Sequence, residues 1–146
     1  MKIRTALSND FPEISPLLAD LLQDRFTSSD DYKASFERLL AGDQGTVLVA
    51  EEAPDAQAQN VILGVITVSY VLALRYRGCY AQIEELVVDP RARGRNLGAS
   101  LVNAATAAAR DANCREIGLY AREHNQPFYE RLGFEYVGPE LRLKLT

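Results

Sequence analysis

The sequence predicts an α/β domain in which a mixed β-sheet is flanked by helices. Strand-like apolar runs alternate with segments of helical periodicity, in the order β-α-α-β-β-β-α-β-α-β. A loop rich in Gly and Arg joins one of these strands to an Ala-rich helix. The 146 residues suffice for one domain, 1–146, with a core that needs neither disulfides nor metal, and no repeat or linker divides the chain.

The first third of the chain predicts a short strand at 3–6 and two amphipathic helices. Ser8-Asn9-Asp10 supplies capping side chains for the first helix, and Pro16 marks an early turn or a kink. A polar break precedes the second helix, which ends at 42–45. The apolar residues at helical spacing are Phe11, Ile14, Leu17, Leu18, Leu21 and Leu22 in the first helix and Tyr32, Phe36, Leu39 and Leu40 in the second.

The rest of the chain predicts further strands and two helices. In chain order these are a strand at 46–51, an exposed loop at 52–60, a long strand at 61–74, a turn at 75–78, a strand at 79–88, a helix at 97–112, a strand at 116–121, a short helix at 127–132 and one or two closing strands at 134–146. Small alanines on one side of the 97–112 helix allow it to approach the sheet closely.

Composition argues against several classes of partner. The net charge is −4 and the isoelectric point is about 5.0, so the overall charge favours neither nucleic acid nor an anionic membrane. The most apolar run, 61–74, is too short to cross a bilayer, and the N-terminus lacks the apolar stretch of a signal peptide. We therefore expect a soluble, cytoplasmic protein.

The cysteine and histidine pattern predicts no metal site. Cys79 and Cys114 stand alone without a C-x-x-C pairing, and His124 is the single histidine. We expect both cysteines to be small core residues in a reducing compartment.

The segment 89–99, Asp-Pro-Arg-Ala-Arg-Gly-Arg-Asn-Leu-Gly-Ala, indicates an anion-binding loop. It leads from a strand into a helix, whose first N–H groups lack partners within the helix and lie at its positive end. Gly94 and Gly98 allow close approach of the backbone, and Asn96 is a residue type that accepts positive φ. The arginines that add charge are Arg91, Arg93 and Arg95. The alternative is an ordinary connection with a solvated basic turn.

Two other phosphate-binding loops do not fit this spacing. A P-loop requires a Lys followed by Ser or Thr after its last glycine, and Gly98 is followed by Ala99. A dinucleotide fingerprint requires G-x-G-x-x-G, whereas Asn96 stands between Gly94 and Gly98. The loop is therefore a different kind of pyrophosphate cradle.

Two motifs in the second half of the chain occur together. The strand ends Val88-Asp89-Pro90 and is followed by Arg93-Gly94-Arg95-Asn96-Leu97-Gly98, and the segment 125–134 places a tyrosine, Tyr129, before Gly133-Phe134. In order and spacing these motifs resemble the GNAT superfamily of acyl-CoA-dependent N-acetyltransferases. Asn96 departs from the usual Gly or Ala, as in some small-amine acetyltransferases of that superfamily. The stretch from Asn125 to Tyr129 is shorter than in many members.

The resemblance implies acetyl-CoA as co-substrate, held between two splayed strands. The pantetheine arm would lie along the strand that ends at Val88, pairing with the backbone of Leu86 and Val88 on either side of Val87. These three residues can equally be explained as core. The resemblance also implies that Asn125 contacts the cofactor. The residues that it implies bind the pyrophosphate are Arg93, Gly94, Arg95, Asn96, Leu97, Gly98 and Ala99.

The same resemblance implies a role for Tyr129 beside the thioester sulfur, where it would protonate the departing thiolate. A phenol is protonated at neutral pH and so is available as an acid. A packed aromatic residue with a satisfied hydroxyl is the alternative. Acyl transfer of this kind needs no enzyme nucleophile, which suits a sequence with no Ser-His-Asp or Cys-His pattern.

Glu84 and Glu85 are candidate bases, or anchors for the ammonium group, on the strand that leads to the thioester. Neighbours on a regular strand point to opposite faces, so at most one of the two faces the acceptor amine. Shared parity with Leu86 and Val88 favours Glu84, with Glu85 second; a bulge in the strand would alter this parity. Solvated edge charges are the alternative explanation for both.

The sequence thus predicts transfer of an acetyl group from acetyl-CoA to the primary amine of a small molecule, by direct attack in a ternary complex. A protein N-terminal or lysine acetyltransferase and a non-catalytic acyl-CoA sensor are the alternatives. The acceptor, the acyl-chain preference and the oligomeric state stay open, with a homodimer among the options. Around 22–34 the acidic residues Asp24, Asp30 and Asp31 hint at a cationic amine, and the basic candidates for a phosphonate acceptor are Arg25, Arg75 and Arg77.

Overall fold

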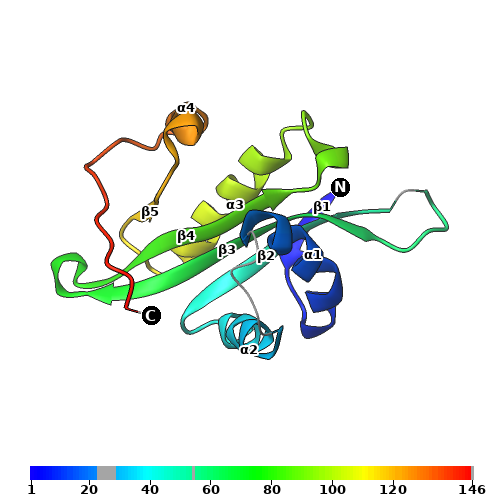
Figure 1. Ribbon diagram of the computed structural model, residues 1–146, viewed down its shortest axis with the longest axis horizontal. Helices are drawn as coiled ribbons and strands as arrows, with labels where there is room; N and C mark the ends of the chain where they lie inside the picture. The colour runs from blue at the N-terminus through cyan, green and yellow to red at the C-terminus, as the bar shows by residue number, and fades with distance from the viewer. Residues whose placement is uncertain (23–28, 54, 146) are drawn as a thin grey trace.

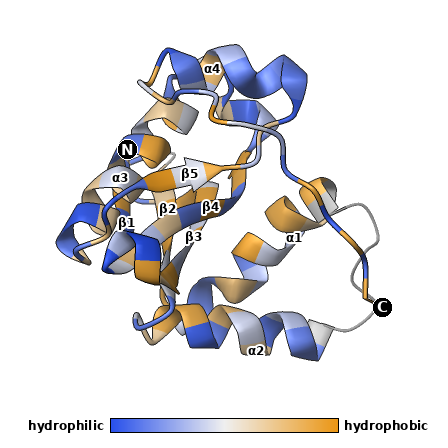
Figure 2. Cartoon of the chain, turned by 90° about the vertical axis from the view of Figure 1, so that its left-hand side faces the viewer, coloured by the Kyte–Doolittle hydropathy of each residue, from blue (hydrophilic) through white to orange (hydrophobic). Residues whose placement is uncertain are grey.

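A β-sheet separates two layers of helices in the computed structural model (Figure 1), which describes residues 1–22, 29–53 and 55–145. Two helices cover one face of the sheet and one long helix covers the other. Apolar and polar residues alternate along all three (Figure 2), and the apolar sides are buried on the sheet. The helices are α1 (Phe11–Leu22), α2 (Ser29–Leu40), α3 (Leu97–Asp111) and the short α4 (Gln126–Glu130).

The sheet has five strands in the order β1-β2-β3-β4-β5. They are β1 (Lys2–Thr5), β2 (Gly45–Glu52), β3 (Val61–Ala73), β4 (Gly78–Val88) and β5 (Ile117–Leu119). Neighbours from β1 to β4 are antiparallel, and β5 is parallel to β4 because α3 returns the chain between them. This arrangement confirms the predicted α/β class with a mixed sheet. No helix in the described part of the chain is long and apolar enough to cross a membrane.

Alternation along the strands builds one hydrophobic cluster on each face of the sheet. The cluster between α3 and the sheet contains Leu48, Ile66, Val68 and Ile83 from the strands and Leu101 and Val102 from the helix, all buried. The cluster between the sheet and the other two helices contains Val47, Val49 and Val65 from the strands, Ile14 and Leu18 from α1 and Phe36 from α2. Gly64 on β3 is needed where α3 crosses, because a Cβ there would lie 2.9 Å from a Leu101 methyl group.

The register of β3 against β4 shifts by one residue in the middle of the sheet. Thr67 pairs with Glu85 and Val68 pairs with Ile83, so Glu84 is an extra residue in β4. A β-bulge of this kind bends its strand and increases its twist. β5 pairs with residues 81–83 of β4, which come before the bulge, and does not continue alongside β4 after it.

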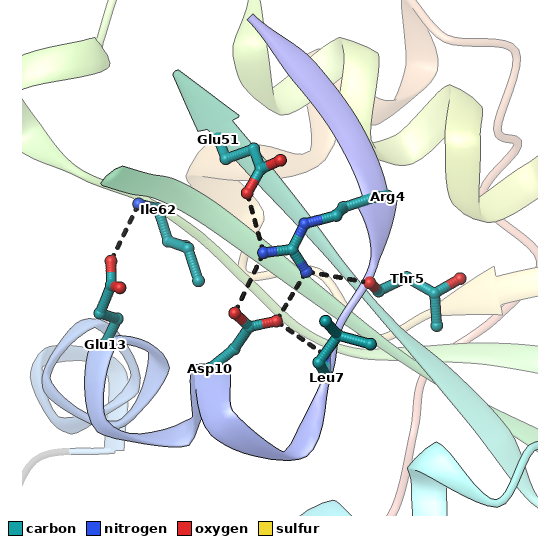
Figure 3. Close-up of polar contacts among 7 residues, drawn as sticks. All are labelled: Arg4, Thr5, Leu7, Asp10, Glu13, Glu51 and Ile62. Carbon is teal, nitrogen blue, oxygen red and sulfur yellow. Dashed lines mark hydrogen bonds and ion pairs between the residues drawn. The ribbon is translucent and has the colours of Figure 1, made fainter. Parts of the chain in front are cut away.

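An ion cluster fastens β1 to its surroundings (Figure 3). The Arg4 guanidinium donates to both carboxylate oxygens of Asp10, at 2.7 and 3.0 Å, and lies 2.8 Å from a Glu51 oxygen on β2. Asp10 also accepts a 2.7 Å hydrogen bond from the Leu7 N–H. Arg4 lowers the pKa of both carboxyl groups. The cluster joins the first strand, the turn before α1 and β2 through one fully paired set of charges.

The prediction of closing strands at 134–146 is wrong for the described residues 134–145, which form no strand. This segment runs along the outside of the molecule to the C-terminus (Figure 1), with Val137 95% and Leu141 91% exposed. Alternating leucines give it the pattern of a strand. However, Pro139 cannot donate a ladder hydrogen bond, Gly138 adopts φ +140°, and β5 is only three residues long. The short β5 is also smaller than the strand expected at 116–121.

Candidate functional site

The outer half of β4 presents an unpaired backbone edge. Residues 85–88 pair with β3 on one side, whereas on the β5 side no described strand pairs with β4 from Glu84 onward. The Asp89 N–H donates to the Leu63 carbonyl at 2.8 Å, and partners in an antiparallel ladder alternate between bonded and non-bonded pairs. Leu86 and Val88 therefore direct their N–H and C=O groups away from β3, into the open side. An extended ligand with amide groups can add to this edge as a further strand.

The predicted anion-binding segment 89–99, called the Gly-rich loop from here on, adjoins this open edge. Gly94 adopts φ +76° and Asn96 φ +60°, so the left-handed conformation expected of Asn96 is confirmed. Asn96 precedes α3 without capping it through its side chain, and the first helical bond runs from the Ser100 N–H to the Asn96 carbonyl. The N–H groups of the three residues between them precede that first bond and are available to an anion; they are Leu97, Gly98 and Ala99.

A pocket of about 380 Å³ lies at this loop. It is lined by Val88, Ala92, Arg93, Gly94, Asn96, Leu97, Gly98, Ala99 and Phe128. A Cβ on Gly98 would lie 3.4 Å from the Phe128 ring, so the backbone and the ring form adjoining walls. The pocket combines helix N–H groups with an apolar side, which fits a pyrophosphate attached to a longer organic arm.

The three loop arginines have different surroundings. Arg91 is paired with Asp89 at 2.8 Å, and Arg95 donates to both oxygens of Glu52 at 2.7 and 2.9 Å. Arg93 is exposed and, among the described residues, forms no ion pair. It lines the pocket and is the arginine whose charge is available there.

Aromatic rings continue the pocket wall towards Tyr129. The Phe128 and Tyr129 rings meet edge to face with centroids 4.9 Å apart, and Phe134 contacts Tyr129 at 5.8 Å. Burial raises the pKa of Tyr129, so its phenol is protonated throughout the neutral range. Asn125, in contrast, is exposed just before α4 and does not line the pocket.

The bulge changes the interpretation of the two glutamates. The regular strand assumed in favouring Glu84 is wrong, because Glu84 is the inserted residue and is exposed. Glu85 shares a face with Val87, the face covered by α1 and α2, and is partly buried. At 3.3 Å per residue, Glu85 lies about 10 Å along the strand from Val88 at the pocket.

The surroundings of the Glu85 carboxyl group raise its pKa into the neutral range. Burial, and next the charge of Glu84, raise the pKa of Glu85 to about 7. The Thr67 hydroxyl on β3 donates to the Glu85 carboxylate, and the Glu85 N–H donates to the same hydroxyl oxygen at 3.1 Å. A carboxyl group with such a pKa can accept a proton and release it at physiological pH.

Two residues near Glu85 were not anticipated from the sequence. Thr67 is buried opposite Glu85, and Tyr32 on α2 has a pKa raised first by burial and then by the Glu85 charge. The hydroxyl residues Thr67 and Ser69 interrupt the apolar run 61–74, and this interruption is the signal that could have identified Thr67. Tyr32 matched a core position of an amphipathic helix, so its spacing gave no such signal.

The acceptor-side suggestions have mixed outcomes. Asp24 and Arg25 lie outside the described residues, while Asp30 and Asp31 are exposed in the first turn of α2. Arg75 stacks on the Tyr76 and Tyr80 rings in the turn between β3 and β4. Arg75 and its neighbour Arg77 lie at the opposite end of β4 from the loop, so these arginines are not brought to the Glu85 site. The described residues contain no cluster of three or more His, Cys, Asp or Glu placed to bind a metal.

The site thus combines an open strand edge, a helix-entry loop, an aromatic wall and a carboxyl group of raised pKa. The family model described as "Acetyltransferase (GNAT) family" matches residues 11–134. The chain therefore belongs to the GNAT family of N-acetyltransferases, in agreement with the resemblance of its two motifs.

Named relatives support the same family. A rice (Oryza sativa subsp. japonica) "Probable glucosamine 6-phosphate N-acetyltransferase 2" is 29% identical over 80% of this chain and 70% of its own length. A Trypanosoma brucei brucei glucosamine 6-phosphate N-acetyltransferase is 40% identical, but over only 43% of each chain. The crystal structure of glucosamine-6-phosphate N-acetyltransferase from Arabidopsis thaliana is similar with a TM-score of 0.82 and 25% identity, covering 99% of this chain and 98% of that one.

Proposed function

We propose that this protein transfers an acetyl group from acetyl-CoA to the primary amine of a small molecule. One observation supports this above all others: the unpaired edge of β4 at Leu86 and Val88 leads directly into the pocket at the Gly-rich loop. A ligand that has both a peptide-like arm and a pyrophosphate fits these two features in succession.

Acetyl-CoA would supply the activated thioester. In this proposal the N–H groups at the start of α3 and the Arg93 side chain hold the pyrophosphate. Leu86 and Val88 hold the pantetheine arm through their backbone groups. The Val87 side chain between them packs against the hydrophobic cluster on the side of α1 and α2. Arg95 stabilises the loop through its ion pair with Glu52, and in this proposal it does not bind the pyrophosphate. Asn125 stays a predicted contact.

The protein's own proton chemistry then involves two residues. Glu85 takes the proton of the incoming ammonium group, directly or through water, because its pKa of about 7 suits a base near neutral pH. Tyr129 gives its phenol proton to the sulfur of the leaving group, for which its raised pKa keeps it in the acid form. No covalent intermediate with the enzyme is required.

The names of the relatives make glucosamine 6-phosphate the first acceptor to test. The experiment measures free-thiol release from acetyl-CoA with this sugar phosphate and with a panel of aliphatic, aromatic and peptide amines. We expect turnover with at least one small amine and little with peptides. Release of thiol with N-terminal peptides alone would instead favour a protein acetyltransferase.

The Gly98→Glu substitution tests the proposed acetyl-CoA site at the Gly-rich loop. The variant places a carboxylate where the pyrophosphate would bind and against the Phe128 ring, so calorimetry should detect no acetyl-CoA binding. Wild-type binding should weaken as salt increases. Equal binding by wild type and variant would contradict the proposed site, whereas binding without turnover of any amine would favour the acyl-CoA sensor.

Tyr129→Phe tests the acid. The substitution keeps the ring contacts with Phe128 and Phe134 and removes only the hydroxyl. We expect kcat to fall by about 10²-fold with acetyl-CoA affinity little changed. A wild-type kcat, under conditions in which chemistry limits the rate, would assign Tyr129 to packing.

A further inference from the structure

The two cysteines, distant in the sequence, meet in the fold. The Sγ atoms of Cys79 and Cys114 are 2.8 Å apart. Cys79 is the second residue of β4, and Cys114 follows α3 on the way to β5. This separation is less than 1 Å longer than a covalent disulfide bond of about 2.05 Å. Both thiols are free in the structure.

The backbone holds the two cysteines side by side. The Arg115 N–H donates to the Cys79 carbonyl at 2.9 Å, and the Ala81 N–H donates to the Glu116 carbonyl at 2.8 Å. These bonds begin the parallel pairing of β4 with β5. The Cys114 N–H donates to the Ala109 carbonyl at 2.9 Å, which fixes the cysteine to the last turn of α3. Ladder and helix hydrogen bonds therefore hold the two thiols next to each other.

The surroundings of the pair leave it partly accessible. Both cysteines are half-buried, with Cys114 against the cluster beneath α3 and Tyr70 on β3 near both sulfurs. Burial, and next the contact with Cys79, raise the pKa of the Cys114 thiol to about 12. Cys114 is thus a weak nucleophile while Cys79 is reduced, and the first reaction falls to Cys79.

We propose that Cys79 and Cys114 form a reversible intramolecular disulfide, a modification site that responds to small disulfides such as oxidised glutathione. This inference is independent of the proposed function. It replaces the expectation of two isolated core cysteines, because it rests on the 2.8 Å contact of the two sulfurs in a fixed backbone frame.

The reaction proceeds in two exchanges. The Cys79 thiolate attacks one sulfur of glutathione disulfide, which forms a mixed disulfide and releases one glutathione. The Cys114 sulfur then attacks the Cys79 sulfur, forms the protein disulfide and releases the second glutathione. Two protein thiols are oxidised, one small disulfide is reduced to two thiols, and the two thiol protons end on glutathione.

The bond would close the chain around the donor site. The segment from Cys79 to Cys114 contains the bulge in β4, the Gly-rich loop and all of α3. A cross-link over a loop of this length restricts the unfolded chain, and for a domain of this size we expect the melting temperature to rise by roughly 5–15 °C.

The test equilibrates the full chain in buffers with increasing ratios of oxidised to reduced glutathione. After acid quenching, mass spectrometry should show a species lighter by about 2 Da, and digestion should give a peptide linking residues 79 and 114. The linked fraction and the melting temperature should rise together and fall again on addition of a reductant.

Cys79→Ser and Cys114→Ser are the matched controls. Each retains one thiol, so neither should show the mass loss or the rise in melting temperature. Cys79→Ser should also form less glutathione adduct than Cys114→Ser, because the remaining Cys114 thiol has the raised pKa. Wild-type protein that keeps two titratable thiols, that stops at glutathione adducts, or that links only between chains would overturn the proposal.

Discussion

Two of the carboxyl sites that are withdrawn from solvent differ in what faces them. At the end of β1, Asp10 and Glu51 are only 8% and 7% exposed, and both contact the Arg4 guanidinium. In the middle of β4, Glu85 faces a neutral hydroxyl, that of Thr67, and lies next to a second negative charge, Glu84. The first site contains a cation between two anions, and at the second the contacts of Glu85 among the described residues are with Thr67 and Glu84, neither of them a cation.

The difference determines the ionisation of each site. Arg4 lowers the pKa of Asp10 and Glu51, so both stay charged throughout the neutral range. Glu85 has its pKa raised to about 7 by burial and by its neighbour. A carboxylate that cannot change its protonation state serves structure, whereas one that exchanges protons at neutral pH can serve catalysis. Both sites contain carboxyl groups withdrawn from solvent; at the first the Arg4 guanidinium outweighs the effect of burial, and at the second burial decides the direction of the shift.

The largest effect that would test this contrast is expected for Arg4→Ala. Removal of the guanidinium leaves two carboxylates close together without a counter-charge, which should destabilise the fold by roughly 3–4 kcal/mol in urea unfolding. The paired carboxyl groups have lowered pKa values in the fold, so their stabilisation is present above the unfolded pKa of about 4 and is lost as the pH falls below it. The difference between wild type and variant should therefore shrink in acid. Arg142→Ala, which breaks the exposed pair of Arg142 with Glu140, is the control and should unfold like wild type.

Glu85→Gln tests the catalytic half of the contrast. If Glu85 is the base, its neutral isostere should lower kcat/KM by about 10²-fold at pH 8, equivalent to about 2.7 kcal/mol, and remove a rising limb centred near pH 7. Glu84→Gln is the matched control, since Glu84 is adjacent and exposed. Similar pH profiles for wild type and both variants would remove this strand from the proton path.

The smallest effect, and the one of opposite sign, concerns the stability of the same variant. The pKa of Glu85 is higher in the fold than in the unfolded chain, so its contribution to stability is complete below about pH 4 and is lost as the pH rises through 7. Gln carries no such charge. Glu85→Gln should therefore be more stable than wild type by about 1–2 kcal/mol at pH 9 and nearly equal at pH 5. A variant that is less stable at pH 9 would indicate that Glu85 has a counter-charge.

Local sequence preferences predicted the conformation of the Gly-rich loop and the start of α3. Gly94 and Asn96 adopt the left-handed conformation that their residue types allow, and the loop enters the helix within one residue of the expected position. These features depend on neighbours a few positions away, so the local pattern contains them. The same holds for the long strands β3 and β4, whose apolar runs have few alternatives.

Features that depend on pairing between distant segments were not predicted. The bulge at Glu84 is a property of β4 against β3, and neither strand contains a Gly or Pro that marks it. The meeting of Cys79 with Cys114 likewise requires the return of the chain through α3. The alternating leucines near the C-terminus favoured a strand, but a strand also needs an available edge, and periodicity does not report that.

The extra residue in β4 has a consequence for how this position tolerates change. The Glu84 side chain is exposed, so many residue types could replace it without altering the open edge of β4. Its backbone, in contrast, forms the bulge at the point where the pairing with β5 ends. Loss of the whole residue would restore a regular ladder and remove the bend at this point, while Glu85 would still pair with Thr67 on the side of α1 and α2. The position is therefore permissive to substitution and intolerant of deletion, because its contribution is one unit of chain length.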